Sequence, residues 1–158
     1  MAVTLSPTQL ATLKASFTGT GPLVSQVQPL LHANPAAIAA LYASTSSAGA
    51  GNVTKASADK NDVLLTIETA VVNLGGASTA LQQKWMPIAP LLLSLLSAAQ
   101  GAMKKVDVAS LPSLVADGLL TQAQADAPWT RLGSYSEVLL GQGVFPTSDD
   151  IQAATELV

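Results

Sequence analysis

The fold of this chain is decided by residues 59–76, which read DKNDVLLTIETAVVNLGG. Apolar residues recur here at the spacing of one helical face, which is formed by Val63, Leu64, Ile67, Ala70, Val71 and Leu74. The pattern predicts a helix from Asp59 to Leu74 that ends at the two glycines. Leu65 and Val72 fall on the opposite side, so we expect this helix to pack against neighbours on two sides.

Short helical patterns fill the rest of the chain. Their starts are marked by capping residues at Ser6, Asn34, Ser78, Thr121, Ser134 and Thr147 or Ser148. Kinks or breaks are expected at Pro29, Pro87 and Pro90. Strand signals are weak, and only Gly141–Phe145 is compatible with a short extended piece. The sequence therefore predicts an all-α, single-domain helical bundle of seven to nine helices, several short, with an irregular Gly-rich C-terminal segment.

We expect this single domain to have two parts. Residues 1–127 would form the helical bundle core, and residues 128–158 would form an irregular interaction segment. On this interpretation, removing residues 128–158 leaves a folded helical protein and weakens its assembly.

Composition excludes several classes of function. Charged residues make up 11% of the 158 residues, whereas about 25% is usual in soluble domains. With no cysteine and one histidine, disulfide scaffolds, zinc fingers and thiol catalysis are excluded. Lys and Arg together number only 7, too few for a broad basic surface, so no specific nucleic acid is expected as a partner. A surface this poor in charge is most simply explained by covering partner chains, which predicts a homo-oligomer.

The longest uncharged stretch runs from Trp85 to Met103 and is bounded by Lys84 and by Lys104-Lys105. It has nearly the length of a membrane span, and Trp and Lys are typical anchors at membrane interfaces. Two prolines near its start leave an uninterrupted apolar part of about a dozen residues, which favours a buried helix. Membrane insertion of residues 85–103, and an oligomer contact made by this helix alone, stay open as alternatives.

No motif identifies an enzyme. His32, the single histidine, falls on the polar side of its helix and is expected at an exposed helix end. The stretch Gly49–Lys55 lacks the spacing of a phosphate-binding loop and is expected as a flexible loop. Asp149 and Asp150 fit the first turn of a terminal helix. We therefore expect no catalytic residues, no cofactor and no metal ion. No small-molecule ligand is indicated, although a helical bundle that binds a small molecule in an apolar cavity stays open as a third alternative.

Half of the six aromatic residues lie in the last thirty positions. Trp and Arg in such a segment are typical of interface hot spots, although the aromatic side chains could instead fill the end of the bundle. Together with the outer side of helix 59–74, they give the candidate interface residues Leu65, Val72, Trp129, Arg131, Tyr135 and Phe145.

In size, composition, short capped helices and open C-terminal tail, the chain resembles virion structural proteins of tailed bacteriophages, such as head–tail connector or adaptor subunits. The resemblance extends over the whole chain and assigns no functional residue. It implies a ring or shell of identical subunits with partners above and below.

The sequence thus predicts a non-enzymatic structural or assembly protein, a subunit of a larger oligomer and, on the resemblance, a virion component. The alternative is a membrane-active protein that inserts residues 85–103. The N-terminus has neither a basic region nor an apolar run, so we expect no signal peptide and predict synthesis in the cytoplasm.

Overall fold

The computed structural model describes residues 2–157 and is mostly helical, at 57%. The chain packs into two compact units. Residues 2–53 and 131–157 form one of them, here called the terminal unit, and Thr54–Thr130 form the other, the inserted unit. Each unit encloses its own cluster of buried apolar side chains. This differs from the prediction of one bundle core followed by a C-terminal interaction segment.

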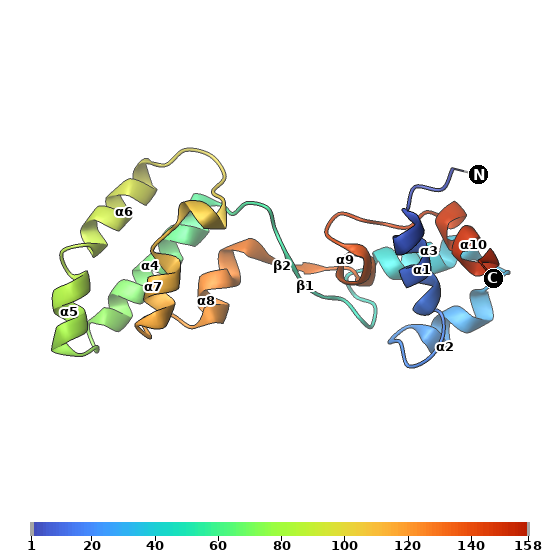
Figure 1. Cartoon of the computed structure of the whole chain (residues 1–158), viewed down its shortest axis with the longest axis horizontal. Helices are drawn as coiled ribbons and strands as arrows, with labels where there is room; N and C mark the ends of the chain where they lie inside the picture. The colour runs from blue at the N-terminus through green and yellow to red at the C-terminus, as the bar shows by residue number, and fades with distance from the viewer. Residues whose placement is uncertain (1, 158) are drawn as a thin grey trace. The chain divides into compact units, whose positions relative to one another are not determined.

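The terminal unit is helical apart from its strand residues (Figure 1), and its helices are α1 (Pro7–Ala15), α2 (Val24–Val27), η1 (Gln28–Leu30), α3 (Pro35–Ala43), α9 (Tyr135–Leu140) and α10 (Ser148–Glu156). Both α9 and α10 pack against α1 and α3. Ile151 of α10 is buried beside Leu13 and Ile38. The segment expected to be an irregular interaction segment was 128–158, and its residues 131–157 supply part of this core.

The inserted unit is built around one long helix (Figure 1), and its helices are α4 (Lys60–Leu74), α5 (Thr79–Trp85), α6 (Ala89–Ala98), η2 (Lys105–Asp107), α7 (Leu111–Ala116), α8 (Gln122–Asp126) and η3 (Ala127–Trp129). The apolar face predicted for α4 is buried against its neighbours, with Val63, Ile67 and Ala70 almost fully covered. The Nζ of Lys60 lies 3.3 Å from the carbonyl oxygen of Ala99. The start of α4 therefore lies beside the end of α6, and the two helices run antiparallel.

The expectation of a strictly all-α chain is wrong. Residues Gly51–Thr54 (β1) and Thr130–Gly133 (β2) form a small two-stranded antiparallel sheet, and Gly141–Phe145 contains no strand. A Gly-Asn start is typical of a loop, and β1 forms only because residues distant in sequence pair with it. Local pattern therefore could not indicate this strand.

The predicted helix starts are confirmed. Side chains of Ser6, Thr121, Ser134 and Thr147 each form a complete capping box with the residue three positions on. Where Pro29 was expected to interrupt a helix, α2 gives way to the 3₁₀ turn η1. Among residues 2–157, nine α-helices have five residues or more, within the expected range.

Candidate functional site

The two candidates on α4 lie on its outer side. Leu65 is 63% exposed and Val72 is 77% exposed. Leu65 borders a hollow that is also lined by Asp62, Thr66 and Pro128. We expected α4 to pack against neighbours on two sides, but within the described residues the chain itself does not cover this outer side.

Trp129 is a core residue of the inserted unit. Its side chain is 1% exposed, and its indole Nε1 donates a hydrogen bond to the carbonyl oxygen of Met103 at 2.9 Å. Its own carbonyl oxygen accepts from the backbone N–H of Lys55 at 2.6 Å. This geometry fits the alternative in which an aromatic side chain fills the interior, because a buried indole with a satisfied N–H presents no contact surface.

Arg131 holds an ion pair within the terminal unit. Its guanidinium makes a two-pronged contact with the carboxylate of Glu137, one prong being Nη1 to Oε2 at 3.0 Å. Glu137 is buried, and its carboxylate also accepts the backbone N–H groups of Gly143 at 3.0 Å and Ser134 at 3.2 Å. The Arg131 guanidinium, aided by these N–H groups and against the effect of burial, lowers the pKa of Glu137 to about 2. Arg131 is thus largely committed to an internal partner.

The last two aromatic candidates differ in exposure. Tyr135 is buried, and its ring centroid lies 5.1 Å from that of Tyr42. Phe145 is about half exposed. Of the six candidates, Leu65, Val72 and Phe145 therefore offer apolar side chains to solvent, and Phe145 belongs to a different unit from the other two.

A row of exposed apolar side chains on α6 was not among the candidate interface residues, although an oligomer contact made by the helix in residues 85–103 had been left open. Ile88, Leu91 and Leu95 recur every three to four residues along one flank of this helix, here called the α6 flank, and Leu91 and Leu95 are 64% and 70% exposed. The adjacent face of α6, which includes Leu96, packs into the core of the unit. The sequence signal for this surface was the excess of leucines in α6. Because this helix is apolar on nearly every side, one neighbouring helix cannot cover all of its leucines.

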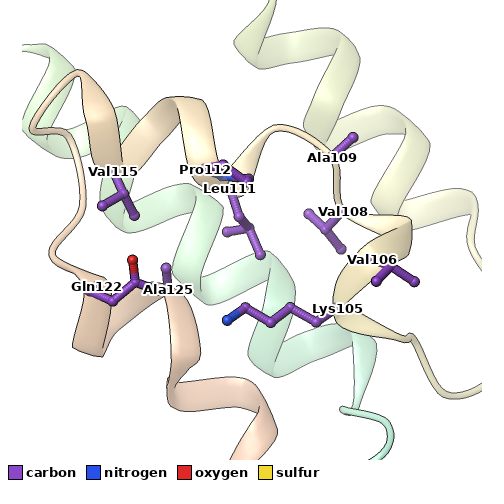
Figure 2. A pocket seen from close by; sticks show the side chains of 9 residues that line it. All are labelled: Lys105, Val106, Val108, Ala109, Leu111, Pro112, Val115, Gln122 and Ala125. Carbon is purple, nitrogen blue, oxygen red and sulfur yellow. The ribbon is translucent and has the colours of Figure 1, made fainter.

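An apolar pocket of about 280 Å³ opens between η2, α7 and α8. Its walls are formed mainly by Val106, Val108, Ala109, Leu111, Val115 and Ala125. Figure 2 shows Lys105 reaching across the pocket toward Gln122 and Ala125. The ammonium of Lys105 pairs with the carboxylate of Asp126, which also accepts from Gln122 Nε2 at 3.0 Å. The charged residue among those that line the η2–α7–α8 pocket, Lys105, is therefore already partnered.

A second hollow, of about 270 Å³, lies in the terminal unit beside His32. His32 has a φ of +64°, and the backbone N–H of Asn34 reaches back to the carbonyl oxygen of Leu30 at 2.9 Å. This is a left-handed helix end, a conformation that histidine adopts more readily than most residues. His32 is exposed there, as the sequence predicts.

The described residues contain no group of three or more His, Cys, Asp or Glu side chains arranged to hold a metal ion. Asp150 is buried as the capping-box partner of Thr147, and Asp59 caps α4 through the backbone N–H of Asn61 at 2.8 Å. These carboxylates are occupied by the ends of helices. Between residues 2 and 157, no helix combines the length and the apolar character needed to cross a bilayer.

No protein-family model, curated protein or solved structure matches this chain.

Proposed function

We propose that this protein is a non-enzymatic assembly subunit that acts through contacts with other protein chains and forms a homo-oligomer. The observation that carries the proposal is the α6 flank. Soluble monomers rarely expose contiguous rows of large aliphatic side chains, and such rows mark interaction surfaces. No charged side chain occurs in α6 or in the rest of residues 85–103, so burying this flank removes no charge from water.

The energetic argument concerns Leu91 and Leu95. Fully burying a leucine side chain that was exposed contributes about 1.5–3 kcal/mol. Because Leu91 and Leu95 are 64% and 70% exposed, burying what remains of both contributes about 2–4 kcal/mol of the roughly 8 kcal/mol that a micromolar contact requires. Val72 and Leu65 on the outer side of α4 add apolar surface in the same unit.

The proposal is tested by the mass of the protein in solution. We expect the wild type to sediment well above its monomer mass of 16.0 kDa, and the double variant Leu91→Gln, Leu95→Gln to sediment near it. Glutamine keeps the helix propensity of leucine close to unchanged, so the fold of α6 is preserved. Ser97→Gln is the matched control, because Ser97 lies on the other flank of α6 and is exposed.

At about 1 mM, a contact with a binding free energy of about 4 kcal/mol would be half populated. A wild-type chain that stays monomeric at that concentration would contradict the proposal. Equal loss of assembly in the Ser97→Gln control would also contradict the role of the α6 flank.

We further propose that the assembly is a virion component. The supporting features are the size, the charge-poor composition and the short capped helices that the chain shares in style with virion proteins of tailed bacteriophages. Electron microscopy of the purified assembly should show closed rings or shells of identical subunits. Open, irregular aggregates of variable mass would contradict this form of the proposal.

The membrane-active alternative uses the same residues 85–103, and flotation with lipid vesicles separates it from the assembly proposal. The assembly proposal expects wild-type protein to remain with the dense fraction. Flotation of wild-type protein that is lost in the Leu91→Gln, Leu95→Gln variant would favour the membrane function.

A further inference from the structure

The inserted unit carries two apolar surface features on different helices. One is the α6 flank, where Leu91 and Leu95 project into solvent. The other is the η2–α7–α8 pocket, whose volume is about 280 Å³. A projecting apolar surface and an apolar pocket on the same chain can form a head-to-tail contact between two copies, and such contacts build a ring when the rotation between copies closes.

The dimensions of the two features agree. Side chains four apart on a helix have Cβ atoms roughly 5–6 Å from one another, so Leu91 and Leu95 can enter one hollow together. A dry cavity of about 150 Å³ holds a benzene molecule, and the η2–α7–α8 pocket is nearly twice that size. Such a helix-in-groove contact uses anchors at this spacing.

The charges of the two features also agree. Lys105 lines the pocket and is already paired with the carboxylate of Asp126, and hydrogen bonding to Lys105 lowers the pKa of that carboxylate. A charged occupant would have to disrupt this pair or lose its own hydration. An uncharged helix meets neither cost. Among the described α-helices that carry no charged side chain, α6 alone exposes large apolar side chains.

We propose that the α6 flank of one copy occupies the η2–α7–α8 pocket of a second copy, so that the subunits join head to tail. This inference rests on the proposed function, because it names the partner and the geometry of the same assembly surface. In this contact Leu91 and Leu95 enter the pocket, and the 81% exposed side chain of Val106 covers them from its rim.

The test mixes two variants that each damage one half of the contact. Leu91→Gln, Leu95→Gln damages the projecting flank. Val106→Glu, Ala109→Glu places charge at the pocket through residues that are exposed, so no core contact is lost. We expect each variant alone to be monomeric and an equimolar mixture to form a species of twice 16.0 kDa and nothing larger.

If Val106→Glu, Ala109→Glu alone assembles as the wild type does, or the mixture stays monomeric, the head-to-tail inference is overturned while the assembly function stands. If the wild type itself is monomeric, both proposals fail. Far-ultraviolet circular dichroism of each variant must match the wild type for the mixture to be interpreted.

A second measurement needs only one uncharged substitution in each half of the contact and uses the absence of cysteine from the chain. The single variants Leu95→Cys and Val106→Cys are mixed in equal amounts and oxidised. We expect the yield of the mixed disulfide, between positions 95 and 106, to exceed the yield of either disulfide between identical variants by about tenfold. A tenfold excess corresponds to a preference of about 1.4 kcal/mol for the mixed contact. A random distribution, or an excess of the 95-to-95 product, overturns the head-to-tail contact.

Discussion

A buried carboxylate, Asp150, fastens the N-terminal segment to α10 in the terminal unit. Its side chain is 0% exposed and accepts five hydrogen bonds. Oδ1 accepts the N–H groups of Thr4 at 2.7 Å and Leu5 at 3.0 Å. Oδ2 accepts the hydroxyl of Thr4 at 2.7 Å, and the N–H and hydroxyl of Thr147 at 2.8 and 2.7 Å. The charge is thus stabilised by hydrogen-bond donors alone, which makes Asp150→Asn a sharp test.

The expected cost of Asp150→Asn follows from these five bonds. The amide keeps one accepting oxygen and presents an NH₂ group in place of the other. The hydroxyls of Thr4 and Thr147 can rotate to accept from it, but the backbone N–H of Thr147 cannot. One orphaned buried donor costs about 1–3 kcal/mol, and the remaining bonds lose about half of their strength with the charge. We expect a loss of about 3 kcal/mol, or roughly 6–12 °C in Tm for a chain of this length.

Urea and thermal unfolding, followed by circular dichroism, measure this loss against a matched control. Asp149→Asn changes the neighbouring residue in the same helical turn, where the carboxylate accepts one bond, from the N–H of Ala2 at 2.8 Å. We expect that control to cost less than about 1 kcal/mol. If the two variants unfold within about 0.5 kcal/mol of each other, the hydrogen-bond argument is wrong.

The same carboxylate predicts a pH dependence with a defined sign. Burial raises the pKa of Asp150, but the hydrogen bonds from Thr147, Thr4 and Leu5 outweigh it and hold the pKa well below its ordinary value. A carboxylate whose pKa is lower in the folded than in the unfolded state stabilises the fold at pH values above its unfolded-state pKa, which is about 3.9. As the pH falls below that value, this stabilisation is progressively lost. The stability difference between wild type and Asp150→Asn should therefore shrink below about pH 4. A difference that stays constant from pH 7 to pH 3 would contradict this assignment.

Two further predictions concern the terminal unit. A Cβ at Gly49, which has a φ of +91°, would lie 2.6 Å from a ring carbon of Tyr135, so Gly49→Ala should cost about 3 kcal/mol in unfolding experiments. Gly143→Ala, with a φ of +73° and no atom within 4 Å of the new Cβ, should cost only about 1 kcal/mol, and equal costs would contradict the close-packing argument. Deleting residues 131–158 should abolish the helical circular dichroism of the terminal unit, because α9 and α10 belong to its core. A truncated chain that keeps helicity in proportion to its length would instead support the expendable C-terminal segment expected from the sequence.

Local chemistry explains which parts of the fold could be predicted from the sequence. A capping box is formed by residues three apart, so Thr121 with Gln124 and Ser134 with Glu137 identify helix starts without reference to the rest of the chain. The break between α5 and α6 follows in the same way from Pro87 and Pro90. The strands β1 and β2 depend on each other across the intervening inserted unit, and neither carries a periodic pattern of its own.

The candidate site was harder to predict because exposure depends on how many neighbours a helix has. Trp129 and Arg131 have the residue types of an interface, yet their hydrogen bonds to Met103 and Glu137 hold them within the chain. Residue type indicates the capacity for a contact, and only the fold determines whether the contact is internal. The same reasoning corrects the expectation of a buried helix in residues 85–103 for Leu91 and Leu95, which are largely exposed.

The leucines of α6 separate the needs of folding from those of assembly. Leu92, Leu93 and Leu96 pack against the core of the inserted unit, whereas Leu91 and Leu95 add nothing to that core, because they are largely exposed. Glutamine at these two positions has nearly the same helix propensity, so an isolated subunit would lose almost no stability and would gain a more polar surface. At a dilution where the wild type is also monomeric, Leu91→Gln, Leu95→Gln should therefore leave the unfolding free energy within about 0.5 kcal/mol of the wild type, whereas at higher concentration the sedimenting mass falls and the stability that assembly adds is lost with it. If the variant is less stable even at that dilution, these leucines act through the fold and not through a partner.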